Sequence, residues 1–430
     1  MEDKPASDIV PVEHLERPPR GSLATFGLFF LGNGEAIRRF AATRHLWLVG
    51  LLFTFSAGLA REYDAEDLLA EPWHLLIAPG ASWVAATALW LLVQLSGVGR
   101  WAWSPVKRVP RLLDSYLAFL GLFWLTAPLA WFYGIPYERL MSAGEAASTN
   151  LWTLQLVALW RVVLMIRVLT VIYGIRPVLA GVIVLLFGDV LMLIALSYVP
   201  VSIFAIMGGV QLGEAERVLA GAAFIGQFLG TLALIVLALA WLISFADRKR
   251  WGWNIATTQV RLAPLMYVAI AVIAWWCLWL PTTQPEQQLR RRIEQAMTTG
   301  DLVTGFALLG KHFPADLPPH WYPPPRPDGR KPNLDPLVVL LYLSTQPSTE
   351  SIQQMYEDKL LNGGLFVHQW DRARILELLT LLEHQRDATR LIHGVDHHEG
   401  VLSLLERQAE DETDNAVRER LQTILKQYRK

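Results

Sequence analysis

Two charged residues lie inside apolar stretches of the sequence, where an ionisable side chain is costly. Arg161 falls near the middle of one apolar run, and Asp189 falls near the middle of the next. A charge at the bilayer centre costs roughly 2.5 to 3.5 kcal/mol, so it usually has a partner. Because only residues 174–176 separate the two runs, they should be antiparallel neighbours. The spacing therefore predicts an ion pair between Arg161 and Asp189.

This pair has two interpretations. As a functional site, it would mark a path for a substrate or a proton, with Gln155 and Gln227 as polar lining. As a structural feature, it would fix two helices in register, and we favour this role because transporters usually carry more polar groups or paired broken helices. Arg167 lies nearer the end of its run, so we expect its side chain to reach the membrane surface.

The densest group of ionisable residues connects the first two apolar runs: Arg61, Glu62, Asp64, Glu66, Asp67, Glu71 and His74. Carboxylates and imidazoles are ligands for divalent metals, and Asp67, Glu71 and His74 would share one face of a continuous helix. Pro72 argues against that continuity, and it places Glu71 at the positive end of the next helix. We therefore expect an ordered, solvated acidic surface with no metal and no cofactor.

The elements that position these residues are apolar runs of the length that crosses a bilayer, about 20 residues each. We predict about seven spans: 43–60, 75–97, 113–133, 151–173, 177–200, 218–245 and 263–280. Ala222, Gly226 and Gly230 recur at four-residue spacing, which lets two helix backbones approach closely. We favour packing within the chain over a dimer seam. The predicted fold class is all-α, a polytopic transmembrane helix bundle followed by an extramembrane helical domain.

Four regions follow from this pattern. Residues 1–42 are an N-terminal tail with an interfacial helix, and residues 43–280 form the transmembrane bundle. Residues 281–334 hold short helices, one of them from Glu286 to Met297, and a proline-rich linker that favours extended backbone. Residues 335–430 form a helical soluble domain.

Charge and composition restrict where the protein acts. Lys and Arg gather in alternate short loops, which predicts a cytoplasmic N-terminus and, with seven spans, a periplasmic C-terminal domain in a bacterial inner membrane. A net charge of -1 argues against nucleic acid as a partner. The single cysteine, Cys277, provides no disulfide framework and no thiolate metal site.

Two segments resemble known proteins. Arg61 to Leu76, together with Phe313 to Arg326, looks like polytopic bacterial inner-membrane proteins of no established activity. Phe29 to Leu51, which runs through Arg38-Arg39 into an apolar stretch, is similar to bacterial Yip1-like membrane proteins. That resemblance implies a multi-helix membrane module whose eukaryotic relatives work in membrane trafficking, and it implies no catalytic residue.

No Ser-His-Asp, phosphate-loop or HExxH pattern is present, so the sequence offers no catalytic residues. We expect a non-enzymatic scaffold or assembly factor in the lipid bilayer, whose tail binds another membrane or periplasmic protein. A transporter or channel component that uses Arg161 and Asp189 is the first alternative. A metal-dependent membrane enzyme that uses the acidic block is the second.

Overall fold

The computed structural model is helical, apart from one two-residue antiparallel pairing of β1 (Gly394–Val395) with β2 (His398–Glu399). It describes residues 21–64, 66–96, 112–197, 214–244, 255–312, 317, 323–324, 335–345, 350–361, 372–384, 388–395, 398–399 and 401–428. Residues 97–111, 198–213 (with Pro200) and 245–254, and most of the proline tract, lie outside this range. The predicted all-α architecture is confirmed.

The first two helices are part of the bundle. They are α1 (Ser22–Phe30) and α2 (Gly34–Ala41), and the Asn33 side chain caps α2 by accepting hydrogen bonds from two backbone N–H groups. Phe29, Ile37 and Phe40 are fully buried in the bundle core. The segment predicted to be an interfacial helix thus forms two helices whose buried apolar residues pack against the neighbouring helices of the bundle.

The membrane helices match the predicted apolar runs. Within the described residues, six helices are long and apolar enough to cross a bilayer. The number rises to seven if α2 and α3, which are bent by 109° relative to each other, are counted as one further span. These helices, with the 3-10 turn η2 that prolongs α5, are α3 (Leu46–Glu62), α4 (His74–Leu95), α5 (Leu112–Trp124), η2 (Ala127–Gly134), α6 (Ala143–Tyr173), α7 (Pro177–Ser197), α9 (Glu214–Ser244) and α10 (Ala263–Thr298). The chain is thus a multi-pass membrane protein.

Glycines set the closest helix contacts. A Cβ on Gly121 of α5 would lie 2.9 Å from the Trp47 backbone nitrogen, so α3 and α5 can approach only because no side chain is present. On α9, a Cβ on Gly226 would meet Leu196, and one on Gly230 would meet Met192, both in α7. Gly226 and Gly230 of α9 therefore pack against α7 within the chain.

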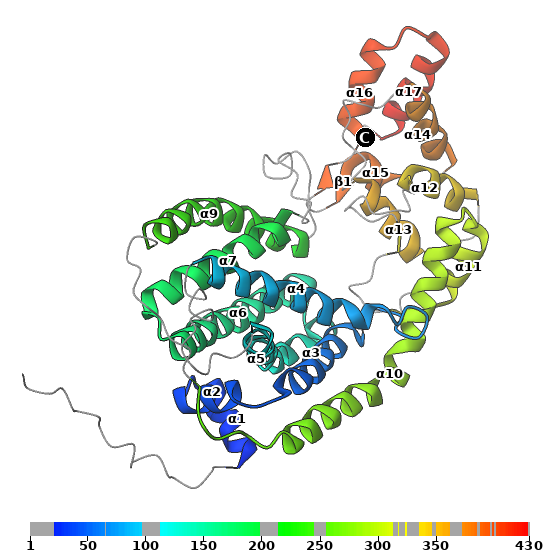
Figure 1. Ribbon diagram of the computed structural model, residues 1–430. Helices are drawn as coiled ribbons and strands as arrows, with labels where there is room; N and C mark the ends of the chain where they lie inside the picture. Colours follow the sequence, from blue (N-terminus) through cyan, green and yellow to red (C-terminus); the bar gives the residue numbers. More distant parts are fainter. Residues whose placement is uncertain are drawn as a thin grey trace, which may run out of the picture.

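Helix α10 joins the membrane bundle to the tail without a break (Figure 1). Its 36 residues span about 54 Å, well beyond the roughly 30 Å of hydrocarbon. Leu265 belongs to the bundle core, whereas Ile293 and Met297 belong to the core of the tail. The separate helix expected from Glu286 is thus the continuation of the last span, through two prolines at 281 and 285 that normally interrupt helices.

The tail is a second helical core built on the end of α10. Its helices are α11 (Leu302–His312), α12 (Pro336–Thr345), α13 (Glu350–Lys359), α14 (Arg372–His384), α15 (Thr389–His393), α16 (Leu402–Asp411) and α17 (Asn415–Tyr428). Part of the proline tract lies across α13, since the fully buried Tyr356 donates a hydrogen bond to the Pro324 carbonyl at 2.7 Å. Lys359 donates another to the Pro323 carbonyl. These two prolines act as a strap on the tail.

Candidate functional site

The α3–α4 loop (residues 63–73) lies against α10 at the point where that helix leaves the bundle (Figure 1). We call its contacts with residues 283–291 of α10 the clamp. The clamp is built from two kinds of interaction, which are amide and hydroxyl hydrogen bonds to the loop backbone and ion pairs to its carboxylates. Both kinds join segments that are more than 200 residues apart in the sequence.

Polar side chains of α10 satisfy the backbone of the loop. The Thr283 hydroxyl donates to the Tyr63 carbonyl at 2.6 Å. The Gln284 side-chain amide donates to the carbonyls of Tyr63 and Glu66 at 3.2 and 3.1 Å, and its oxygen accepts from the Leu69 N–H at 3.4 Å. Because Gln284 is 1% exposed, these bonds satisfy its own buried amide and tie it to the backbone of the loop.

One helical turn further along α10, Gln287 repeats this arrangement. It is 3% exposed, and its amide donates to the Asp64 carbonyl at 2.5 Å. Residues 283, 284 and 287 lie on one face of α10, as the helical spacing requires. This face holds the loop by its main chain.

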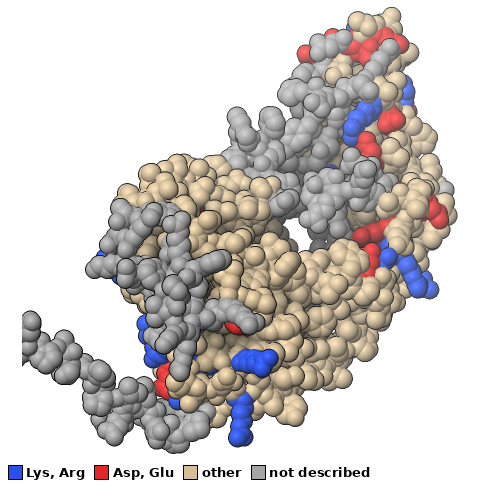
Figure 2. Space-filling model, in the orientation of Figure 1, with Lys and Arg blue, Asp and Glu red and all other residues tan. Residues whose placement is uncertain are grey.

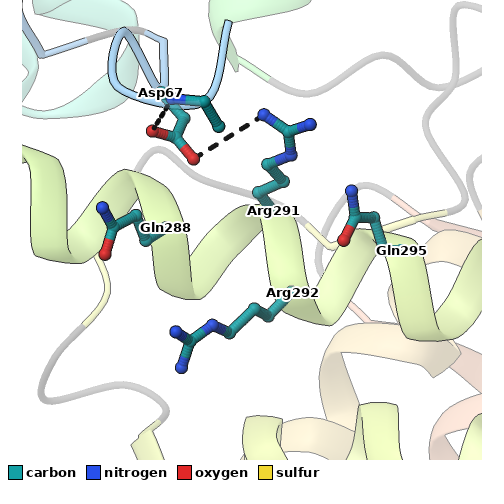
Figure 3. A pocket seen from close by; sticks show the side chains of 6 residues that line it. Asp67, Gln288, Arg291, Arg292 and Gln295 are labelled. Atoms are coloured by element: carbon teal, nitrogen blue, oxygen red, sulfur yellow. Dashed lines mark hydrogen bonds and ion pairs between the residues drawn. The ribbon is translucent and has the colours of Figure 1, made fainter.

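Arg291 binds two of the predicted acidic residues. Its Nη2 lies 3.2 Å from Glu71 Oε1 and its Nη1 lies 3.7 Å from Asp67 Oδ2 (Figure 3). Asp67 is 7% exposed and also accepts a hydrogen bond from the Ala70 N–H at 3.1 Å. The second Glu71 oxygen bonds to His74 at 3.2 Å. These carboxylates are therefore paired with α10, and the expectation of a solvated acidic surface is wrong for Asp67.

A hollow of about 370 Å³ lies beside this ion pair. It is lined by Asp67, Ala70, Gln288, Arg291, Arg292 and Gln295. Figure 3 shows Arg291 directed toward Asp67 across it, whereas Arg292 extends from the opposite side of the helix. Since Arg291 already compensates Asp67 and Glu71, the metal set considered for Asp67, Glu71 and His74 is not formed.

A second charged group surrounds Asp64. Arg139, from the 3-10 turn η3 (Tyr137–Arg139), lies 3.1 Å from Glu286 and 4.0 Å from Asp64. Arg290 also pairs with Glu286. Burial raises the pKa of the Asp64 carboxyl, and the neighbouring Arg139 opposes that shift. The group therefore links the loop, η3 and α10 in one charge network.

Tyr63 anchors the start of the loop through contacts with other parts of the protein. Its hydroxyl donates to the Gly134 carbonyl at 3.1 Å, and its ring lies 5.0 Å from the Trp276 ring. Burial, with a further contribution from Asp64, raises the pKa of Tyr63 to about 12. The phenol is thus a neutral donor at any physiological pH.

A different set of residues has the chemistry to hold a metal. Ligand atoms of Glu62, Glu66 and His74 all lie within 4.8 Å of one another, and all three residues are half-buried. Two carboxylates and an imidazole suit a divalent transition metal such as Zn or Mn. The sequence gave no reason to select this trio, because the turn between α3 and α4 brings them together.

The predicted midplane pair is not formed. Arg161 Nε donates to the Thr126 hydroxyl at 3.2 Å, and its guanidinium lies 5.4 Å from the centre of the Phe123 ring. Asp189 instead lies beside Gly230 of α9, and its buried Oδ2 has no hydrogen-bond partner within the described part of the chain. Helices α6 and α7 are neighbours as expected, but the two side chains point to different neighbours.

The other intramembrane polar residues do not converge on Arg161 either. Gln227 donates to the Leu196 carbonyl at 3.1 Å, which ties α9 to α7, and Gln155 is exposed on the outside of α6. Arg167 Nε donates to the Gly32 carbonyl at 3.0 Å. Its side chain remains exposed, but it holds the turn between α1 and α2. No polar path is assembled among these residues.

The residues of α10 that form the clamp were not singled out in the sequence. Their signal is a polar stripe at helical spacing, formed by positions 283, 284, 287, 290 and 291, directly after an apolar run. Pro281 and Pro285 predict a break in the helix at this point, so the helical spacing of these polar residues was not recognised.

Comparison with protein-family models, with curated proteins and with solved structures finds no match for this chain. The interpretation of the clamp therefore rests on its geometry.

Proposed function

We propose that the chain is a non-enzymatic scaffold of a bacterial inner membrane, which holds its helical tail in a fixed orientation so that the tail binds another membrane or periplasmic protein. The observation that supports this function is the path of α10. One helix contributes to the core of the bundle and to the core of the tail, and the α3–α4 loop clamps it between the two.

The clamp is strong enough to resist a hinge at this point. Opening it would break the hydrogen bonds of Thr283, Gln284 and Gln287, each worth about 1 kcal/mol net, and would leave buried backbone groups unsatisfied at a further cost. It would also separate Arg291 from two carboxylates. A tail that acts as a mobile module would need a flexible linker, which is the opposite of this arrangement.

The charge distribution supports a cytoplasmic N-terminus. Basic side chains lie at the end of the bundle where α1 and α2 lie (Figure 2). Described arginines there include Arg38, Arg39, Arg44 and Arg176. Since basic residues favour the cytoplasmic side, the opposite end with the clamp and the tail would be periplasmic if seven segments cross the membrane.

The two alternative functions receive less support. A transport role depended on an Arg161–Asp189 pair, and these two groups have different neighbours. A metal-dependent enzyme would have to use Glu62, Glu66 and His74, and none of these three residues lines the hollow beside Asp67.

Site-specific photo-crosslinking in cells tests the proposal. A photoreactive residue at the exposed Val338 of the tail should crosslink one defined protein in the wild type. A clamp variant with Gln284→Ala and Arg291→Gln should lose that crosslink, because the tail is no longer held in position. Gln288→Ala, on the same helix but outside the hydrogen bonds of the clamp, is the control and should retain it. Equal crosslinking by the clamp variant would contradict a role for fixed orientation.

A further inference from the structure

Two guanidinium groups meet at the turn between α1 and α2, at the end of the bundle opposite the clamp. Arg167 of α6 and Arg38 of α2 both face Gly34, the first residue of α2. Arg167 Nη2 lies 3.5 Å, and Arg38 Nη1 3.7 Å, from the position that a Cβ on Gly34 would occupy. The hydrogen bond from Arg167 Nε to the Gly32 carbonyl fixes the first guanidinium in this place.

Neither guanidinium has an anionic partner among the residues that the structure describes. The nearby Glu35 is paired with Arg39, on the same helix. Two like charges that face one small space repel each other, and an anion placed between them removes that repulsion. Arginine is also the side chain that binds phosphate in a bidentate manner. The arrangement has the donors and the charge of a phosphate site.

An apolar surface adjoins these arginines. Leu31, at the end of α1, is 78% exposed, and Val163, one turn before Arg167 on α6, is 56% exposed. Trp160 is held beside them by a hydrogen bond from its Nε1 to the Phe30 carbonyl at 3.0 Å. The exposed face of α6 continues through Leu159 and Leu156 toward the other side of the membrane.

The depth of the arginines suits a lipid headgroup. Arg167 lies within two turns of the end of α6 at Tyr173, close to the membrane surface rather than at its centre. A ligand with a phosphate at Arg38 and Arg167 and with alkyl chains along α6 would match both surfaces at once. Free phosphate would contact only the two arginines and not the apolar face of α6.

We propose that Arg38, Arg167 and Gly34 form a binding site for the phosphate group of an anionic membrane lipid, whose acyl chains lie along the exposed apolar face of α6. Gly34 is part of the site because a side chain there would fill the space between the guanidinium groups. The proposal does not depend on the scaffold function, since the two sites lie at opposite ends of the bundle.

Native mass spectrometry of the full chain, released from nanodiscs of mixed phosphatidylglycerol and phosphatidylcholine, tests this site. The wild type should retain one phosphatidylglycerol in preference to phosphatidylcholine. Arg38→Gln and Arg167→Gln should each lower that preference about tenfold, because each removes charge-assisted hydrogen bonds to phosphate. Arg44→Gln removes the same charge from an exposed residue at this end of the bundle and should leave the preference unchanged.

Gly34→Ala keeps both arginines and separates a specific site from a general effect of charge. The added methyl would lie at ordinary contact distance from its neighbours, the nearest being Val171 at 3.4 Å, so the fold should tolerate it. Phosphatidylglycerol retention should nevertheless fall, because the methyl occupies the space for phosphate oxygens. This variant also keeps the proposal testable if Arg167→Gln disturbs the turn at Gly32.

Three results would overturn the proposal. A loss in Arg44→Gln equal to that in Arg167→Gln would indicate diffuse electrostatic attraction. Full retention of phosphatidylglycerol by Gly34→Ala would show that the phosphate does not bind in the space between the guanidinium groups. Displacement of the lipid by millimolar inorganic phosphate, with binding of that phosphate in its place, would show that the ligand is a soluble phosphate compound.

Discussion

Replacement of Gln284 by alanine should open the clamp while leaving both helical cores intact. The Gln284 side chain is 1% exposed and makes three hydrogen bonds to the loop backbone. Without it, the Tyr63 carbonyl still accepts from Thr283, and the Glu66 carbonyl still accepts from the Leu68 N–H. The Leu69 N–H loses its partner, but this residue is 67% exposed and the donor can bond to water instead.

The loss of these three hydrogen bonds amounts to about 3 kcal/mol, since each contributes about 1 kcal/mol net. The cost falls on the local opening of the α3–α4 loop. Because 1.4 kcal/mol corresponds to a factor of ten, amide hydrogen exchange of residues 66–71 should become about a hundredfold faster. Hydrogen–deuterium exchange with mass spectrometry, on the full chain in nanodiscs, measures this rate directly.

Gln288→Ala is the matched control. Gln288 is half-buried on the same helix, and it lines the hollow beside Asp67 without forming a hydrogen bond to the loop. Its replacement should change exchange at 66–71 less than about threefold, the effect of an ordinary surface substitution. Unchanged exchange in Gln284→Ala, or an equal increase in both variants, would refute the clamp.

Three further predictions follow from the charged residues. Burial raises the pKa of Asp64, so the contribution of this residue to the free energy of unfolding falls as pH rises above the usual carboxyl pKa. Asp64→Asn should remove this pH dependence of stability and stabilise the protein at neutral pH. Thermal unfolding in detergent at a series of pH values measures both effects. Arg161→Leu and Asp189→Leu should have additive effects on the free energy of unfolding, because the two side chains have different neighbours. A double variant that is more stable than the sum of the single effects predicts would show that the two residues do form an ion pair. Metal analysis of the purified protein should find no stoichiometric metal, and a metal lost in His74→Ala would instead support a site with Glu62 and Glu66.

The membrane helices were predictable because hydrocarbon thickness sets the length of an apolar run. Helix α7, for example, spans Pro177–Ser197 against an expected 177–200. The Gly174 turn was also accessible from the sequence, since its positive φ of 66° is a conformation that glycine adopts without strain. Both signals are local, so one sequence is enough to find them.

The direction of Arg161 could not be predicted. Helix α6 is apolar on all sides, so periodicity does not assign a rotation about its axis. The same helix contacts η2 and α7, and Arg161 points toward Thr126 on the first side and not toward Asp189 on the second. The sequence correctly predicted that α6 and α7 are neighbours. To predict which side chains pair, the rotation of each helix about its axis must also be known.

The clamp was hidden for a different reason. Its partners are separated by more than 200 residues, and nothing in the local sequence of the acidic loop specifies what covers it. Continuity of α10 through Pro281 and Pro285 was the missing step, because it places the polar stripe of residues 283–291 beside the loop. Tertiary packing here overrides the usual helix-breaking effect of proline.

The distance between the bundle and the tail, measured by double electron–electron resonance, tests most directly whether the clamp fixes the tail. Spin labels at Leu140 and Val338, both exposed, would be introduced after replacing the single free cysteine, Cys277, by serine. In nanodiscs, the wild type should give one narrow distance distribution, and the variant with Gln284→Ala and Arg291→Gln should give a broad one. A broad distribution in the wild type would contradict a tail held in fixed orientation.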